Sequence, residues 1–247
     1  MIASPSPCHD SSDGCLEPTR NELLHLGWQL AGGGASGPPP AWIAICELVQ
    51  ASARVLELGD EVGSARHLAA ARAQVAQLRD GMSPELEREI ASLLEGHREP
   101  AGAGWLALSP AELRAIVEHR TARTSGARAS FAAMIGARAA GGSPARIADI
   151  AHCAGELGIA QRMAEALIPQ HDDLRALRPS WAWVWTAEVA DAPSWVRLGR
   201  WARQISRTGA DPTPLAQLLQ QFAARHGVEQ ARARIELARR ALDRIHP

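Results

Sequence analysis

The chain has 247 residues, 46% of them hydrophobic and 21% charged, and all 26 basic residues are arginines because the sequence contains no lysine. A formal net charge of −1 gives no broad electrostatic reason to expect nucleic acid or an acidic membrane surface as a partner. Without lysine, Schiff-base chemistry and a P-loop are excluded. The length suffices for one large domain with its own core.

Residues 1–18 are rich in Ser, Pro, Asp and Gly, which predicts a disordered tail. Cys8 and Cys15 lie in this tail at a spacing that fits no compact zinc motif. We expect these cysteines, with Cys46 and Cys153, to be free thiols of a cytoplasmic protein. The N-terminal segment lacks the pattern of a signal peptide, and no apolar run approaches the ~20 residues of a membrane span.

Helix signals are frequent and strand signals are nearly absent. In chain order, the expected helices span 41–59, 84–96, 110–120, 144–168, 214–226 and 228–245. Ser109 and Glu112 have the spacing of a capping box, and Gly227 is expected to separate the last two helices. The pattern predicts an all-α, single-domain bundle of roughly eight to ten helices over residues 19–247.

Small residues recur on one face of the expected helix 144–168. Ala151, Ala154, Gly155 and Gly158 follow one another at steps of one, three or four residues. Side chains this small allow a neighbouring helix to approach closely. We therefore expect a neighbouring helix to pack closely against this face.

Three segments carry a further pattern, in the order ELVQASARVLELGDEV (47–62), TSGARASFAAMIGARAAGGSPARIADIAHCAGELGIAQ (124–161) and HGVEQARARIELARRALDRI (226–245). In the longest of them, Gly155, Leu157, Gly158 and Ala160 form a Gly-x-Leu-Gly-x-Ala pattern. The segments resemble the trans-isoprenyl diphosphate synthase, or polyprenyl synthetase, family of the class I terpenoid synthase fold. They cover 74 of the 247 residues, and the resemblance implies that fold.

The resemblance also implies Mg²⁺ ions held by two Asp-Asp-x-x-Asp motifs, because cations must neutralise the departing diphosphate. The first motif falls at 57–61, where Glu57, Asp60 and Glu61 are expected to share one helical face. The second motif retains only Glu165 and ends in a proline. These four carboxylates are the candidate metal ligands, and the alternative is solvated helix ends.

The cations expected to bind diphosphate are also depleted. The family's lysine before a threonine corresponds to Thr124, and an Arg-Arg pair survives only in part, at Arg66. Arg123 and Arg128, together with the nearby Arg120, could still face a diphosphate, or they could be ordinary surface arginines. The cluster His171, Asp172 and Asp173 could bind metal, or it could cap a helix N-terminus.

Tryptophan is concentrated in one segment. Five of the eight tryptophans fall within 21 residues, at Trp181, Trp183, Trp185, Trp195 and Trp201. They could line a cavity that stabilises carbocations, or they could form a protein interface. Because residues 181, 183 and 185 cannot share one helix face, we expect some of them to reach an exposed surface.

The degenerate motifs leave open whether the chain is catalytic. The leading hypothesis is a non-catalytic partner or regulatory subunit of a heteromeric prenyl diphosphate synthase or terpene-pathway enzyme, forming a homo- or heterodimer and requiring no cofactor. The alternative is an atypical terpene synthase or prenyltransferase that uses Mg²⁺ and an allylic prenyl diphosphate. A third reading is a helical interaction module unrelated to prenyl chemistry.

Overall fold

A computed structural model describes residues 20–57, 59–78, 84–97 and 103–245. The tail predicted over 1–18, with its two cysteines, lies outside these residues. Within them the secondary structure is helical, without strands, so the all-α prediction is confirmed. The elements are α1 (Arg20–Leu30), α2 (Pro40–Glu57), α3 (Glu61–Val75), α4 (Pro84–Gly96), the 3-10 helix η1 (Ala103–Ala107), α5 (Pro110–Thr121), the π-helical turn η2 (Ala122–Gly126), α6 (Ala127–Ala139), α7 (Pro144–Glu165), α8 (His171–Arg175), α9 (Trp181–Val189), α10 (Ala192–Thr208), α11 (Thr213–Phe222), the π-helical turn η3 (Ala223–Gly227) and α12 (Val228–Ile245).

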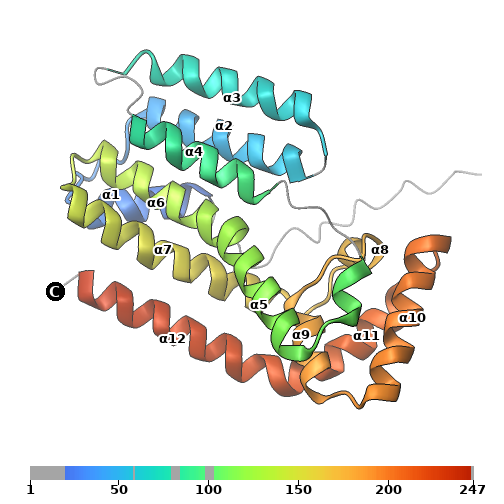
Figure 1. Ribbon diagram of the computed structural model, residues 1–247. Helices are drawn as coiled ribbons and strands as arrows, with labels where there is room; N and C mark the ends of the chain where they lie inside the picture. The colour runs from blue at the N-terminus through green and yellow to red at the C-terminus, as the bar shows by residue number, and fades with distance from the viewer. Residues whose placement is uncertain (1–19, 58, 79–83, 98–102, 246–247) are drawn as a thin grey trace, which may run out of the picture.

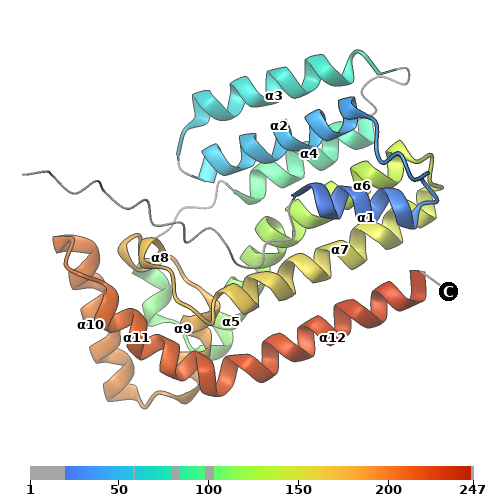
Figure 2. The same ribbon diagram turned by 180° about the vertical axis from the view of Figure 1, so that it is seen from behind.

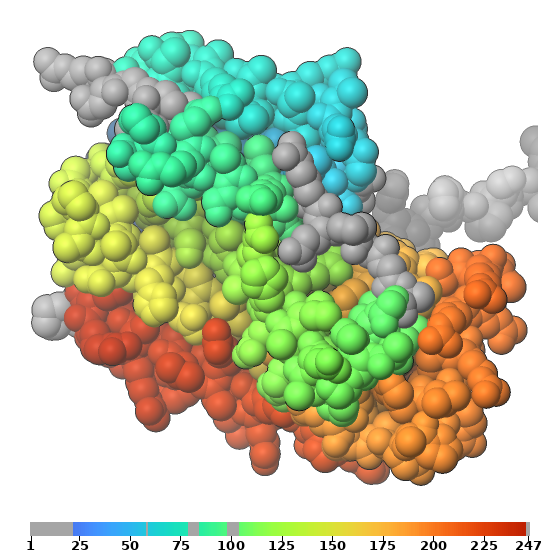
Figure 3. Space-filling view, viewed as in Figure 1, coloured from blue at the N-terminus to red at the C-terminus, as the bar shows by residue number. Residues whose placement is uncertain are grey.

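The long helices run side by side in layers (Figures 1 and 2). α3 packs on α2, α4 contacts α2 and α6, and α6 packs between α1 and α7. α12 lies along α7, so that α3 and α12 occupy opposite edges of the molecule (Figure 3). The helices α5, α8, α9, α10 and α11 gather at one end of these layers (Figure 1). No helix in the described ranges is long and apolar enough to cross a membrane.

Capping residues fix where helices begin. Ser109 and Glu112 form the predicted capping box at the start of α5, because the Ser109 hydroxyl accepts from the Glu112 amide while the Glu112 carboxylate accepts from the Ser109 amide. The Ser143 side chain accepts from the amide of Arg146 at the start of α7. Each of these two starts depends on residues only three positions apart in the sequence.

The turn after α2 overturns one expectation. α2 ends at Glu57, and Gly59 adopts φ +84°, a left-handed conformation that suits glycine. Asp60 then caps α3, its carboxylate accepting from the amide of Gly63 at 2.7 Å. The prediction that Glu57, Asp60 and Glu61 share one helical face is therefore wrong, since a turn separates the first from the others.

The last two helices are also not separated by Gly227 as predicted. The chain continues from α11 through η3 directly into α12. A Cβ on Gly227 would lie 2.5 Å from the ring of Trp185, so this position is a close contact between α9 and the continuing helix. α5 continues through η2 into α6 in the same way. π-helical turns of this kind occur often at functional sites.

The glycines of α7 permit the predicted close packing. A Cβ on Gly158 would lie 2.5 Å from the carbonyl oxygen of Ser125, and one on Gly155 would lie 2.6 Å from the hydroxyl oxygen of Ser130. These contacts bring α7 against η2 and α6. The cysteines of the described chain, Cys46 and Cys153, are both buried.

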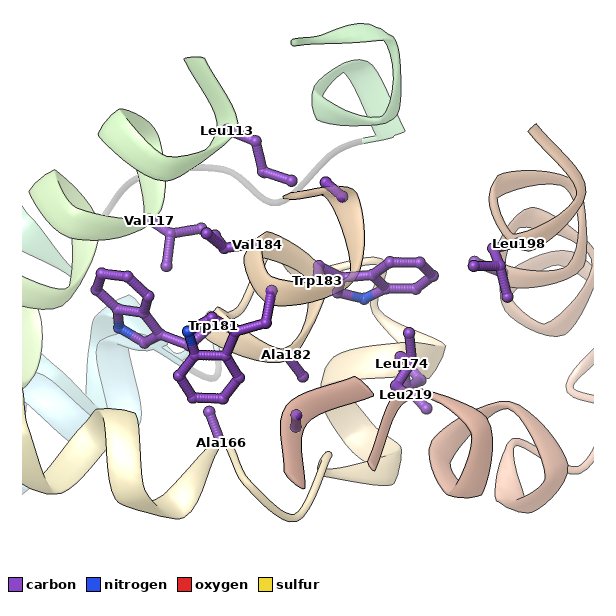
Figure 4. Close-up of a cluster of buried hydrophobic side chains, with 14 of the residues drawn as sticks. Leu113, Val117, Ala166, Leu174, Trp181, Ala182, Trp183, Val184, Leu198 and Leu219 are labelled. Atoms are coloured by element: carbon purple, nitrogen blue, oxygen red, sulfur yellow. The ribbon is translucent and has the colours of Figure 1, made fainter. Parts of the chain in front are cut away.

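The tryptophans of α9 form a buried core (Figure 4). Trp181, Trp183 and Trp185 are each at most 2% exposed, which contradicts the expectation that some of them reach the surface. The reason is that α9 is enclosed on all sides, with every residue from 181 to 187 buried. Trp195 and Trp201 are partly buried and pack against the same cluster.

Ring contacts and hydrogen bonds fix the orientation of this core. Trp183 makes edge-to-face contacts with Trp105 and Trp195, at centroid distances of 5.1 and 5.8 Å. The indole N–H of Trp181 donates to the hydroxyl of Thr121 at 3.1 Å. These tryptophans therefore pack the core of this end of the chain, and Trp181 also lines the cavity described next.

Candidate functional site

A cavity of about 310 Å³ opens where the ends of α2, α5 and α7 meet α8 and the start of α9. Its wall is strongly polar and rich in arginine. The lining residues are Arg54, Glu57, Val117, Arg120, Thr121, Thr124, Ser125, Arg128, Arg162, Glu165, Ala166, Gln170, Asp172, Asp173, Arg178, Pro179, Ser180 and Trp181.

Arg162 joins two of the carboxylates in this cavity. Its guanidinium donates to Glu165 at 3.2 Å, one turn later on α7, and to Asp173 on α8 at 3.0 Å. Arg178 contacts the other oxygen of Asp173 at 3.6 Å. Burial opposes the charge of Arg162, but Asp173, Glu165 and Glu57 together raise its pKa. A permanent cation thus occupies the centre of the acidic groups.

The donor set does not fit the Mg²⁺ centre that the resemblance implies. A hard divalent cation requires several carboxylate oxygens that are free to coordinate it. Glu57 and Glu165 line the same cavity, but Glu165 is engaged by Arg162 and Gln161. In the part of the chain that the structure describes, no group of three His, Cys, Asp or Glu residues is arranged to hold a metal ion.

Arg120 is another cation that lines the cavity. Its half-buried guanidinium makes no hydrogen bond or ion pair within the described ranges. Burial lowers the pKa of Arg120; Arg178 and Arg162 lower it further, while Asp173 and Glu57 act in the opposite direction. The surrounding protein therefore leaves this positive charge partly unneutralised.

Two hydroxyls and a helix start add uncharged hydrogen-bond donors. Ser125 on η2 and Ser180 before α9 line the cavity, and neither hydroxyl bonds to another described residue. Ser180 is the N-cap residue of α9, and no side chain caps the helix there. Amide groups at a helix start favour negative charge.

The structure brings some predicted site residues together and separates others. Glu57, Glu165 and Arg128 line the cavity. Asp60 and Glu61 are exposed at the start of α3, and Arg66 is exposed further along that helix, so none of these three lines it.

The remaining predicted cation, Arg123, also lies outside the lining. It pairs with Glu95 on α4 at 3.5 Å, which draws its guanidinium toward that helix. Arg120, which the sequence offered only as a possible diphosphate contact, lines the cavity in its place.

Sequence reasoning missed Arg162 and Arg178. The sequence left metal binding and helix capping open for Asp173; it lies in the first turn of α8 with Asp172, and it also forms ion pairs in the cavity. One local signal was available for Arg162, namely its i, i+3 spacing to Glu165.

Comparison with known proteins shows the fold. The chain is similar in structure to the crystal structure of a polyprenyl synthetase from Streptomyces coelicolor A3(2), with a TM-score of 0.70, 18% identity, and coverage of 91% of this chain and 78% of that one. It is also similar to the polyprenyl synthase ISP_B from Roseobacter denitrificans, with a TM-score of 0.67, 19% identity, and coverage of 92% and 79%. No family model and no curated protein matches the sequence.

Proposed function

From the polyprenyl synthetase fold that this chain has, we propose that it is a non-catalytic partner or regulatory subunit of a prenyl diphosphate synthase or terpene-pathway enzyme. One observation carries this proposal. The guanidinium of Arg162, which lines the cavity, joins Glu165 to Asp173, so carboxylates that would hold Mg²⁺ are instead neutralised by the protein itself.

The chemistry explains why this arrangement opposes turnover. A diphosphate leaves an allylic carbon only when its developing charge is neutralised, and metal-dependent catalysis supplies that charge with divalent cations. An arginine can bind a diphosphate but does not supply the free carboxylates that hold those cations in place. The cavity thus favours binding of a diphosphate group over its departure from an allylic carbon.

A surface for a partner is available on α3. This helix lies at the edge of the molecule and packs mainly on α2 (Figures 1 and 3). Its exposed residues include Val62 and the alanines Ala65, Ala69, Ala70 and Ala73. Small apolar side chains along an exposed helix allow another helix to approach closely, which supports a dimer through this face.

Two measurements test the proposal. The purified chain with Mg²⁺, isopentenyl diphosphate and geranyl, farnesyl or geranylgeranyl diphosphate should form no elongated or cyclised product. Co-expressed with each catalytic prenyl synthase of its source organism, it should co-elute with one and change that enzyme's activity or product length. Ala69→Glu on α3 should abolish co-elution, while Ala148→Glu, at an exposed position of α7, should preserve it. A strictly monomeric chain without effect on any synthase would contradict the proposal.

One observation favours the competing function, an atypical Mg²⁺-dependent enzyme. Glu57 at the end of α2 and Glu165 at the end of α7 line one cavity, as two opposed metal motifs would. Under this alternative, the chain alone releases a hydrocarbon or alcohol from an allylic diphosphate, and Glu57→Gln abolishes the release. Turnover with that dependence would replace the proposed role by a catalytic one.

A further inference from the structure

We propose that the arginine-rich cavity binds a diphosphate group without any divalent metal ion. Guanidinium groups and hydroxyls would surround the ligand, and Arg162 would fix the geometry by holding two carboxylates away from it. The inference rests on the proposed function in one respect, the absence of metal-dependent turnover at this site. It concerns binding, and it holds whether or not the chain has a partner.

The charge balance of the cavity favours an anion. Two lining residues are set aside because they face solvent: Arg54 is exposed, and Asp172 is 90% exposed in its side chain and pairs with Arg175. The remaining charged residues are the arginines 120, 128, 162 and 178 and the acids Glu57, Glu165 and Asp173. Four cations face three anions, so the cavity carries a surplus of one positive charge.

The guanidinium of Arg120 carries a positive charge that a ligand in the cavity can contact. Arg162 donates to both Glu165 and Asp173, and Arg178 shares Asp173, so these partners are already engaged. Arg120 lines the same wall without a hydrogen bond or ion pair to any described residue. A guanidinium without such a partner is well suited to bind an oxyanion, which it can hold through two parallel hydrogen bonds.

The uncharged donors lie on the same wall. The hydroxyls of Ser125 and Ser180 make no hydrogen bond to other described residues, whereas the hydroxyl of Thr124 donates to the backbone oxygen of Arg120. The π-helical turn η2 carries Ser125, and the start of α9 follows Ser180. Donors from two elements thus converge on one space, as phosphate oxygens require.

The size of the cavity fits a diphosphate. About 310 Å³ corresponds to roughly ten water molecules at the ~30 Å³ that each occupies in the liquid. This is enough for two linked phosphate groups. The group could belong to a prenyl diphosphate or to free diphosphate, since the same chemistry recognises both.

Isothermal titration calorimetry of the full chain tests the inference. Inorganic diphosphate and farnesyl diphosphate are each titrated in EDTA and again with Mg²⁺, with inorganic phosphate as the smaller anion. We expect diphosphate binding in EDTA that Mg²⁺ does not strengthen. Arg120→Gln should weaken it about tenfold or more, the effect of losing one hydrogen bond to a charged group. Arg200→Gln, at an exposed position of α10, is the matched control and should bind as the unmodified chain does.

The possible results separate the ligand sources and the hypotheses. Tighter binding of farnesyl diphosphate than of inorganic diphosphate assigns the site to a prenyl ester, and equal binding assigns it to the diphosphate group alone. Binding that requires Mg²⁺, binding that survives Arg120→Gln, or no binding in EDTA overturns the inference. Product formation with Mg²⁺ contradicts the proposed function instead, and that result comes from a separate assay.

Discussion

Arg162 and Asp173 are joined by a hydrogen-bonded ion pair of 3.0 Å that links the end of α7 to α8. The Asp173 side chain is only 14% exposed, and its two carboxylate oxygens contact this partner and Arg178. The same guanidinium holds Glu165. One arginine therefore determines whether the carboxylates at this end of the cavity can coordinate a cation.

Replacing this arginine should convert the cavity from an anion site toward a cation site. In Arg162→Gln, Glu165 and Asp173 lose their shared cation and line the cavity with Glu57, while Asp173 keeps only its longer contact to Arg178. We expect Mn²⁺, used as a probe for Mg²⁺, to bind at least about tenfold more tightly than to the unmodified chain. Calorimetry or Mn²⁺ electron paramagnetic resonance measures this. Adding Glu165→Gln should remove the gain, and unchanged Mn²⁺ binding in the single variant would refute the assignment.

Gly158 connects helix packing to the cavity. A Cβ there would lie 2.5 Å from the Ser125 carbonyl oxygen and 2.7 Å from the Ala129 Cβ, so α7 and η2 would have to separate. Gly158→Ala gains about 1 kcal/mol of helix propensity, but overpacking costs about 1–3 kcal/mol. We expect a net loss of stability in urea unfolding and weaker diphosphate binding. Gly34→Ala is the control because no atom lies within 4 Å of its Cβ.

Local chemistry explains which parts of the fold could be predicted from the sequence. The capping box of Ser109 and Glu112 involves residues three apart, and the small face of Gly155 and Gly158 is set by helical periodicity. The prediction that Gly227 separates two helices is wrong, because a close contact with Trp185, 42 residues earlier, overrides the usual preference of glycine for helix ends.

The candidate site depended on contacts that periodicity does not encode. Arg162 and Asp173 are eleven residues apart and belong to different helices, so their pairing requires the turn between α7 and α8. Arg120 belongs to a third helix, α5, and its lack of a partner becomes visible only in three dimensions. Glu57 and Glu165 were identified through the family resemblance, whereas the cation between the acidic groups was not.

The tryptophan core should be more important for stability than for ligand binding. Trp183 is 1% exposed and contacts two other tryptophan rings. Trp183→Ala should cost about 3–5 kcal/mol of unfolding free energy because it removes a large buried side chain. Trp201→Ala, at a partly buried position, should cost less. Urea denaturation followed by far-ultraviolet circular dichroism compares them, and equal small losses would show that α9 is not a packed core.

His97 should make stability depend on pH. Its Nδ1 bonds to the carbonyl oxygen of Leu93 at 2.8 Å, while its buried Nε2 has no hydrogen-bond partner within the described chain. Burial lowers the pKa of His97 from 6.5; the bond to Leu93 opposes the shift, Arg128 and Arg120 reinforce it, and Glu57 opposes it. The folded protein therefore favours the neutral ring more than the unfolded chain does.

The sign of the effect follows from that difference. The stability contribution is fully present above the unfolded pKa near 6.5 and is lost as the pH falls from there toward the folded value, at up to about 1.4 kcal/mol per pH unit. His97→Gln should flatten this dependence, because glutamine does not titrate. Urea unfolding at pH 7.5 and pH 5.5 measures it in both proteins. An equal loss in the variant would show that the pH dependence arises elsewhere, since only the unmodified chain has an imidazole to protonate at this position.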